Sequence, residues 1–364
     1  MDVIKKILND RILQISFLVF SFLSIISRPN LSDINWNTIF SLFSLMLLVK
    51  CFDYLNVLNY FVFVLLKKFD NTRTVSQMIV FFSFFSSMLL TNDVAILTLV
   101  PLVFLIRKRI DINTIFLVTL VNIAANLGSS VTPIGNPQNI FILNFYHLSF
   151  FSFFKMSFLV GILSILLLFF FSLKFKKEDI KIYELSSPKI NFKKIIILII
   201  FSFFILLSFF SIISKWIMIL FSIIAVLITN KQLLKKIDYS ILITFVLFFL
   251  AVGSFSRINM VNNFFSSFIH SDFSVYLISL FSSQIISNVP AAVLVSKFTG
   301  RVYPLFLGVS IGGLGSLVAS LANLLAYKEY RKNKKDRYLS IFLKINFIFL
   351  MILGIVFYLL FKLG

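Results

Sequence analysis

Two stretches of sequence, FSSMLLTNDVA at residues 85–95 and FSSQIISNVPA at residues 281–291, carry the same short polar motif, once in each half of the chain. Each is followed by a second interruption rich in Gly, Ser and Asn: NLGSSVTPIGNPQN (126–139) and GGLGSLVASLAN (312–323). Polar, helix-breaking sequence at membrane depth is costly unless it lines a cavity. Paired breaks in corresponding positions of two halves therefore predict a transporter whose binding site lies where two repeats meet.

The composition is that of a membrane protein. The 364 residues are 59% hydrophobic and only 13% charged, with a mean hydropathy of +1.01. Several runs approach the ~20 apolar residues that span a bilayer, so we expect an all-α polytopic membrane protein. The basic residues lie between apolar segments, where they set topology, and we expect no nucleic-acid partner. The single cysteine, Cys51, excludes an intramolecular disulfide.

The apolar runs predict two halves that share the order span, arm, hairpin, broken span, span. We expect a first membrane repeat at 1–173, a cytoplasmic linker at 174–194 and a second membrane repeat at 195–364. The span at 195–213 has no evident partner in the first half. In chain order the expected elements are spans at 12–27 and 36–51, an arm at 52–68, a hairpin at 74–106, a broken span at 112–147, spans at 151–173, 195–213, 216–230 and 239–255, an arm at 257–270, a hairpin at 272–300, a broken span at 303–327 and a span at 338–361.

Positive charge orients this path. If the first hairpin is re-entrant, most of the 34 Lys and Arg residues fall on one side of the bilayer. The positive-inside rule makes that side the cytoplasm, so the N-terminus is cytoplasmic, hairpin 74–106 faces the cytoplasm and hairpin 272–300 faces outward. Opposite hairpin orientations predict an inverted repeat. The basic N-terminal run lacks a signal-peptide cleavage site, and we interpret it as an uncleaved first span in the plasma (cytoplasmic) membrane.

The first tip, Thr91-Asn92-Asp93, has atoms that suit small ions. A helix that stops at mid-membrane leaves free carbonyls, and the next helix begins with free amides. The carbonyl end and side-chain oxygens suit Na⁺, whereas the amide end, with its positive dipole, suits an anion. Ser287-Asn288 repeats the arrangement in the second half. Capped turns in a packed bundle, or kinks without ligand contacts, are the alternative interpretations of these breaks.

Asp93 is the one acidic residue that this topology places deep in the membrane. Intramembrane carboxylates are costly and usually functional. Asp93 could bind Na⁺, carry a proton, or only cap the second half-helix of the hairpin. An anionic substrate would be held mainly by half-helix amides, hydroxyls and bound cations.

Other classes of function find no support in the sequence. It contains no phosphate loop, no nucleotide-binding motif and no soluble domain, which excludes an ATP-driven pump in one chain and leaves a separate ATPase subunit open. His147 and His270 are far from any ligand-rich cluster, so they predict no metal site. We expect no enzyme activity and no cofactor, with Na⁺ or H⁺ as the coupling ion and a small anion and the lipid bilayer as partners.

Four motifs together resemble the citrate-transporter-like anion permeases of the ion transporter superfamily, which includes arsenite permeases, divalent anion/sodium symporters and a branch of Na⁺/H⁺ antiporters. They are TNDVAILTLVPL (91–102), GSSVTPIGNPQN (128–139), SQIISNVPAAVL (283–294) and GGLGSLVASLAN (312–323). The resemblance covers the chain from about residue 12 to 361. It implies hairpin tips whose Asn and Thr contact substrate carboxylates, one Na⁺ site per half formed with the following broken-helix loop, and a homodimer.

This chain departs from the sodium-coupled dicarboxylate pattern at the third tip position, where Asp93 and Val289 replace Thr. The Thr-Asn-Asp tip and the TPIGNPQN loop are more similar to the arsenite-permease and antiporter side. Carried onto this sequence, the resemblance gives two sets of candidates. Substrate-binding candidates are Thr91, Asn92, Thr132, Pro133, Asn136, Ser287, Asn288, Ser316 and Asn323; cation-binding candidates, suited to Na⁺, are Asp93, Asn126, Gly128, Ser129 and Gly315.

The function expected from these features is secondary active transport of a small anion, either a carboxylate or an inorganic oxyanion, coupled to Na⁺ or H⁺ and working by alternating access. A Na⁺/H⁺ antiporter that uses Asp93 is one alternative, and the finding of one carboxylate argues against it. An arsenite efflux permease is another. A non-transporting scaffold or receptor is a third, and the polar breaks, kept at energetic cost, argue against it.

Overall fold

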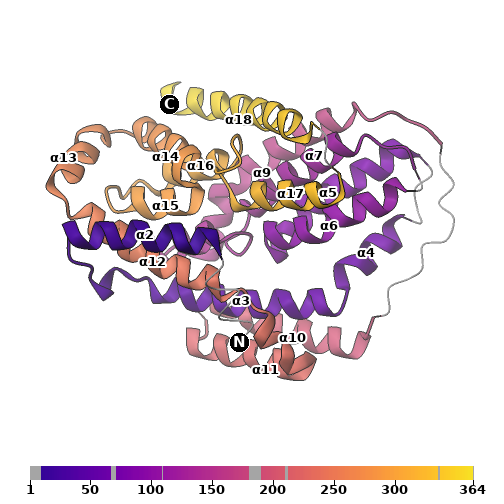
Figure 1. Ribbon diagram of the computed structural model, residues 1–364, viewed down its shortest axis with the longest axis horizontal. Coiled ribbons are helices and arrows are strands. Elements are labelled where there is room, and N and C mark those ends of the chain that lie inside the picture. Colours follow the sequence, from indigo (N-terminus) through magenta and orange to yellow (C-terminus); the bar gives the residue numbers. More distant parts are fainter. Residues whose placement is uncertain are drawn as a thin grey trace.

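The computed structural model describes residues 10–66, 71–108, 110–179, 190–209, 212–334 and 337–363. These residues form helices joined by short turns, without a β-strand among them (Figure 1). Seven of the helices are long and apolar enough to cross a membrane. The expected all-α polytopic membrane fold is therefore confirmed.

The first half contains every element that the sequence predicts there. The expected hairpin is the pair α5 and α6, and the expected broken span is the pair α7 and α8. The helices are α2 (Arg11–Ile26), η1 (Leu31–Asp33), α3 (Trp36–Tyr54), α4 (Val57–Leu66), α5 (Thr72–Leu90), α6 (Asn92–Arg107), α7 (Thr114–Ser129), α8 (Pro137–Phe145) and α9 (Phe150–Ser172).

The second half repeats this order after one additional helix, α10. The hairpin is α14 and α15, and the broken span is α16 and α17. The helices are α10 (Phe192–Phe209), α11 (Lys215–Asn230), η2 (Lys231–Lys236), α12 (Tyr239–Ser256), α13 (Asn259–Phe268), α14 (Asp272–Ile286), α15 (Asn288–Ser296), α16 (Val302–Gly312), α17 (Leu321–Asn333) and α18 (Tyr338–Leu363). The domain division at 173 and 195 stays a prediction, and linker residues 180–189 lie outside the described part of the chain.

Polar residues fix where the hairpin and broken helices begin. The Asn71 side chain accepts a hydrogen bond from the Thr74 N–H at the start of α5, and Asn113 does the same for Phe116 at the start of α7. Ser271 and Ser274 form a capping box at the start of α14. Asn136 caps α8, whose first residue is Pro137. Such caps satisfy amides that a helix start would otherwise leave unpaired.

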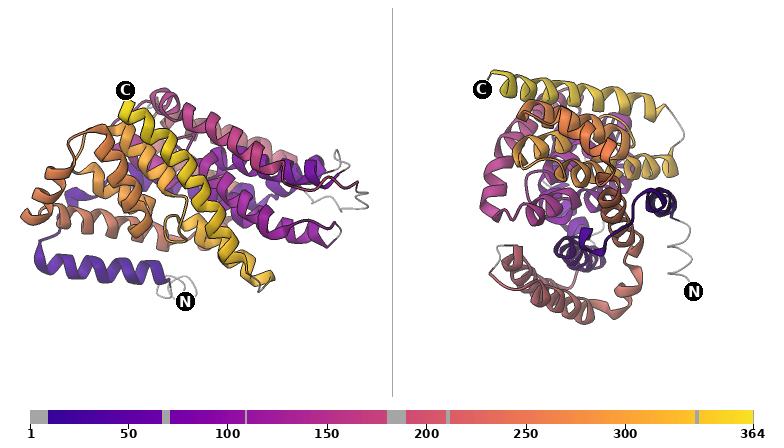
Figure 2. Two further views of the ribbon diagram at one scale, coloured as in Figure 1. Left: turned by 90° about the horizontal axis from the view of Figure 1, so that it is seen from above. Right: turned by 90° about the vertical axis from the view of Figure 1, so that its left-hand side faces the viewer.

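The two hairpins lie at opposite ends of the long axis of the molecule, α14 and α15 at one end and α5 and α6 at the other (Figures 1 and 2). Each packs most extensively on its own broken helix, α5 on α7 and α14 on α16. The flanking helices are exchanged: α2 packs on α12, whereas α11, which precedes α12, packs on α3. The breaks of both halves are thereby brought into the middle of one bundle.

An ion cluster joins the α2–α3 turn to the second half. Asp33 accepts a hydrogen bond of 2.8 Å from Arg257 Nη1, and Lys297 Nζ lies 3.8 Å from its other carboxylate oxygen. The carboxylate lies directly against Gly253 of α12, where an added Cβ would be 2.2 Å from Asp33 Cγ. Beside this cluster, the Tyr146 hydroxyl at the end of α8 donates to the Thr299 carbonyl at 2.8 Å. These contacts hold the elements together at the end of the molecule that carries the second hairpin.

Candidate functional site

Each hairpin turns at a single residue held in the same unusual backbone conformation. Thr91 separates α5 from α6 with φ 77° and ψ 149°, and Ser287 separates α14 from α15 with φ 76° and ψ 154°. A residue with a Cβ pays about 1–3 kcal/mol for such a conformation, and this strain persists only where the surroundings impose it. The same strain at both tips indicates the same local construction.

The tip amides are fixed by the loops of the following broken helices. The Asn92 N–H donates to the Gly135 carbonyl at 3.2 Å, and the Asn288 N–H donates to the Ala319 carbonyl at 2.9 Å. Neither half-helix has a hydrogen bond from the side chain of its N-cap residue, Thr91 or Ser287. The positive ends of the α6 and α15 dipoles therefore point into the region between tip and loop without a cap from Thr91 or Ser287. In α6 the side chain of Asn92 bonds one first-turn amide, since its Oδ1 accepts from the Asp93 N–H at 2.9 Å.

A loop hydroxyl in each half reaches back to the preceding hairpin helix. Thr132 Oγ1 donates to the Met88 carbonyl, and Ser316 Oγ donates to the Gln284 carbonyl at 3.4 Å. Both carbonyls belong to the last turn before the tip, where helix ends leave acceptors without intrahelical partners. The two hydroxyls thus join each loop to the carbonyl end of its hairpin.

An asparagine after each loop ties the loop carbonyls together. Asn139 Nδ2 donates to the carbonyls of Ser129 at 3.0 Å and Thr132 at 2.9 Å. Asn323 Nδ2 donates to the carbonyls of Gly313 at 3.0 Å and Ser316 at 2.8 Å. Both asparagines are fully buried. With residues 128–139 aligned to 312–323, these are the same contacts made twice.

Glycines allow the broken helices to touch the hairpins. An added Cβ at Gly128 would be 2.1 Å from the Phe84 carbonyl oxygen, and one at Gly312 would be 2.8 Å from Ser283 Cβ. Gly315 has φ +93°, and an added Cβ there would meet Gln284 Oε1 at 2.6 Å. Backbone approaches this close exclude a side chain. The candidate cation positions Gly128 and Gly315 are thus required by the packing of the site.

The two half-sites meet through buried amides. Asn92 Nδ2 donates to Asn126 Oδ1 at 3.2 Å, and the Ser320 hydroxyl of the second half donates to the same oxygen at 3.0 Å. Asn122 Nδ2 and Asn126 Nδ2 both donate to Asn323 Oδ1, each at 2.8 Å. Asn122 and Asn126 lie one turn apart on the same face of α7. One continuous hydrogen-bonded cluster therefore connects the first tip to the second broken helix.

Asp93 lies in the first turn of α6, where the helix dipole favours a negative charge. Among the described residues, no helix-start amide is capped by the Asp93 carboxylate. The carboxylate is buried, and the like charge of Asp238, which caps the start of α12 in the other half, acts on it through space. The structure thus brings a second carboxylate, which the sequence placed in a loop, into range of the tip.

The structure brings most of the candidate residues together. Thr91, Asn92, Asn126, Gly128, Ser129, Thr132 and Asn136 surround the first tip and loop, and Ser287, Asn288, Gly315, Ser316 and Asn323 surround the second. Pro133 is buried in the first loop without a side-chain hydrogen bond, as its chemistry dictates. Asn136 is occupied structurally, since it caps α8 and donates to Ser129 Oγ at 3.2 Å.

Sequence reasoning missed two polar contributors besides Asp238. Asn122 lies inside an apolar run, and its spacing of four from Asn126 was the available signal. Gln284 replaces Met88 in the second motif. Its Nε2 donates to the carbonyls of Gly312 at 2.6 Å and Leu314 at 2.8 Å, and its Oε1 accepts from the Ser316 N–H.

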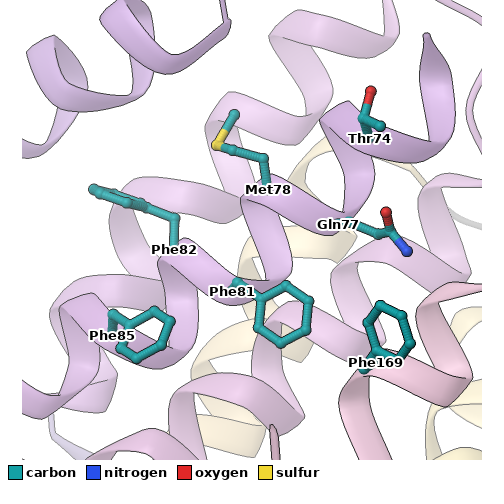
Figure 3. A pocket seen from close by; sticks show the side chains of 7 residues that line it. All are labelled: Thr74, Gln77, Met78, Phe81, Phe82, Phe85 and Phe169. Atoms are coloured by element: carbon teal, nitrogen blue, oxygen red, sulfur yellow. The ribbon is translucent and has the colours of Figure 1, made fainter. Parts of the chain in front are cut away.

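The ligand atoms available at the site are mainly neutral oxygens and amides. In the described part of the chain, no three His, Cys, Asp or Glu side chains lie together, so hydroxyls, carbonyls and Asn oxygens would supply most ligands of a Na⁺ ion. A separate groove of about 360 Å³ runs along α5 and α9 (Figure 3). It contains none of the candidate residues, and its lining is mostly apolar: Thr74, Gln77, Met78, Phe81, Phe82, Phe85 and Phe169.

The chain is similar in sequence to proteins that are named as transporters or as a membrane protein. The chain is 36% identical over 298 residues to the uncharacterized transporter MJ0456 of Methanocaldococcus jannaschii, with 81% of each chain covered. It is 28% identical over 301 residues to the inner membrane protein YbiR of Escherichia coli K12, covering 81% of this chain and 80% of YbiR. A putative transporter, arsB of Dictyostelium discoideum, is 34% identical over 168 residues, which cover 44% of this chain and 30% of arsB.

The family model described as citrate transporter matches residues 11–304, a range that includes both hairpins and the first broken helix. The expected resemblance to the citrate-transporter-like permeases is thereby confirmed. The match covers most of the chain, and two of the similar proteins are named as transporters. This chain belongs to the citrate transporter family.

Proposed function

We propose that the protein is a secondary active transporter that moves a small anion, a carboxylate or an inorganic oxyanion, by alternating access with Na⁺ or H⁺ as the coupling ion. It acts as a carrier and performs no enzymatic chemistry. The observation that carries the proposal is the repeated half-site: two strained tips, two tip amides fixed by loop carbonyls and two loop hydroxyls, all meeting at one amide cluster. A duplicated site between two halves is the arrangement that alternating access uses.

The chemistry of the two kinds of helix end divides the ligands. The α6 and α15 N-termini, without side-chain caps from Thr91 and Ser287, suit the anion. The carbonyl ends of α5 and α14, together with the oxygens of Asn126 and Ser129, suit a cation. A bound cation next to the substrate offsets the negative charge of the anion, which gives a physical reason for coupled binding.

We further propose that both hairpins are re-entrant and that the halves form an inverted repeat in the plasma membrane with a cytoplasmic N-terminus. An ion pair between Asp272 and Arg301 joins the two ends of the second hairpin. The Thr72 N–H donates to the Glu178 carbonyl at 2.9 Å, so the start of the first hairpin lies beside the basic segment that follows α9. The name of YbiR, an inner membrane protein, supports the same membrane.

Cysteine labelling tests this topology. In a Cys51→Ala background, single cysteines at positions 72 and 110 are expected to react only from the cytoplasmic side, and cysteines at 271 and 301 only from outside. Reaction of positions 72 and 110 from opposite sides would contradict the re-entrant hairpin.

A thermal-shift screen of the purified protein tests the function. Citrate, dicarboxylates, arsenite and inorganic oxyanions are compared in NaCl and in choline chloride. A ligand that binds the folded state raises its apparent stability by mass action. We expect one anion class to stabilise the protein, and to do so more strongly with Na⁺ or at lower pH. Absence of any anion effect under all conditions would reject the anion-transport proposal.

A Na⁺/H⁺ antiporter is the second candidate, and one observation favours it. The sequence shows only one carboxylate at membrane depth, but the structure brings Asp238 into electrostatic range of Asp93. Two carboxylates from different halves are groups that could exchange Na⁺ for H⁺. Proteoliposomes with a pH-sensitive dye decide between the candidates, because an antiporter moves protons on addition of Na⁺ alone, without any anion substrate.

A further inference from the structure

The two half-sites differ in the hydrogen bonds that each makes to the other half. The correspondence between residues 128–139 and 312–323 matches Asn139 with Asn323, and its extension toward the helix starts matches Asn126 with Ser310. Asn323 Oδ1 accepts two hydrogen bonds from α7, from Asn122 and Asn126. Its counterpart Asn139 Oδ1 is buried without a partner among the described residues, and so is Ser310 Oγ. The polar link between the halves is therefore made once and not twice.

This link is continuous from one half-site to the other. It begins at the first tip, where Asn92 donates to Asn126. Asn126 donates to Asn323, and Asn323 donates to the Gly313 and Ser316 carbonyls of the second loop. The second tip lies against that loop, since an added Cβ at Gly313 would be 2.8 Å from Asn288 Nδ2.

Asn126 is the point at which a change at the first tip would be transmitted. Its Oδ1 accepts hydrogen bonds from Asn92 of the first half and from Ser320, the N-cap of α17, in the second half. A cation that binds Asn126 Oδ1 competes with these two bonds. In a buried, low-dielectric cluster each hydrogen bond depends strongly on its neighbours.

We propose that Asn126 and Asn323 form a one-sided link that couples the first half-site to the second loop, with Asn122 as a positioning residue that holds Asn323. The coupling is a property of the fold, and its use in transport rests on the proposed function. In the described part of the chain, the Asn122 side chain donates to Asn323 and makes no hydrogen bond to either tip, so its removal perturbs the link and leaves the tip hydrogen bonds in place.

Hydrogen exchange measured by mass spectrometry tests the link without any ligand. Asn122→Ala removes one of the two donors to Asn323 Oδ1. We expect the amides of residues 313–320 to exchange about two- to tenfold faster, the change expected for one net hydrogen bond. The matched control is Ser310→Ala, at the position in α16 where no hydrogen bond is made. It is expected to leave exchange of residues 130–136 unchanged.

A second comparison separates transmission from simple loosening. Asn92→Ala alone is expected to speed exchange at 313–320, although among the described residues the Asn92 side chain donates to Asn126 and not to that loop. The substitution Asn126→Ser removes the donor to Asn323. In that background, Asn92→Ala is expected to cause no additional increase in exchange at residues 313–320. Additive effects of the two substitutions would overturn the link, as would unchanged exchange at 313–320 in Asn122→Ala.

Hydrogen exchange is also measured in NaCl and in choline chloride. This comparison tests the link separately from the proposed transport function. If Na⁺ slows exchange at 313–320 in the wild type and does so less in Asn122→Ala, the link serves ion coupling. If Na⁺ changes nothing in the wild type, the Na⁺-coupled form of the proposed function fails. The link itself is then still decided by Asn122→Ala and Ser310→Ala in choline chloride.

Discussion

The first and second half-sites share a backbone arrangement and differ in chemistry. Both have a strained tip residue, a tip amide bonded to a loop carbonyl, and a buried asparagine that ties the loop. At the third tip position the first has Asp93, and the second has Val289. One turn before the tip the first has Met88, and the second has Gln284 with three hydrogen bonds to its loop.

From this difference we infer, as an extension of the proposed function, that the two halves have different roles. The first half-site contains the negative charge, and its hairpin is held to the loop through the hydroxyl of Thr132. The second half-site has no acidic group at its tip and is more firmly braced by Gln284. A charged, less braced site suits a coupling ion that binds and leaves, whereas a neutral, braced site suits the positioning of an anion.

The largest expected effect comes from the glycines beneath the tips. Gly128→Ala would place a methyl group 2.1 Å from the Phe84 carbonyl oxygen, a backbone atom that cannot move aside. Gly312→Ala meets the Ser283 side chain at 2.8 Å. We expect Gly128→Ala to destabilise the fold by ~3 kcal/mol or more and Gly312→Ala by ~1–2 kcal/mol. Thermal unfolding in detergent measures both. Equal losses would show that the two approaches are equally tight in solution.

Removal of the asparagine side chain at either hairpin tip is expected to abolish transport. Asn92→Ala and Asn288→Ala each remove a side chain that reaches the centre of the site. Loss of a hydrogen bond to a charged ligand costs about 1.5–3 kcal/mol, or roughly tenfold to a hundredfold in affinity. Uptake into proteoliposomes measures the effect, with thermal unfolding as the check on folding. Wild-type uptake by both variants would refute the assignment.

Gln284→Met makes the second half-site resemble the first. Three hydrogen bonds to the second loop are lost, and the Gly312 and Leu314 carbonyls lose a donor. We expect a loss of ~1–3 kcal/mol in stability and faster hydrogen exchange at residues 313–320. The reverse change, Met88→Gln, is the matched control and is expected to leave exchange of that loop unaltered. Unchanged exchange in Gln284→Met would show that Ser316 and Asn323 suffice to hold the loop.

Asp93→Asn is expected to have the smallest effect on stability and the clearest effect on coupling. It keeps the shape of the side chain, removes the charge and makes the first tip as neutral as the second. Anion binding should persist in the thermal-shift screen while its dependence on Na⁺ and pH disappears. The same dependence in the variant and the wild type would assign Asp93 to helix stabilisation alone.

The sequence predicted both breaks because their causes are local. Gly and Pro cannot continue a buried helix, and Ser, Thr and Asn at its ends cap it, so the tip at Thr91 and the loop at Pro133 could be located from composition alone. All the expected spans coincide with helices for the same reason. The candidate residues around each tip followed from their place in the motifs and from family resemblance.

The contacts between halves could not be predicted in this way. Asn122 lies in an apolar run, and only the packing of α7 near α17 shows that it meets Asn323. Asp238 is an ordinary loop residue in the sequence, and only the folded chain brings its charge into electrostatic range of Asp93. Periodicity carries no information on pairs so distant along the chain, which is why the link and the second carboxylate emerged only from the structure.

The exchange of α2 and α11 between the halves has a consequence for biogenesis. The ribosome delivers α2 long before α12, the helix on which α2 packs, and α3 is also made long before its partner α11. The newly made first half therefore has two apolar helix faces without their partner helices, and lipids or the insertion machinery must cover these faces. Neither half is a finished folding unit. A chain divided within residues 180–189 should yield a working carrier only when both fragments are made in the same cell.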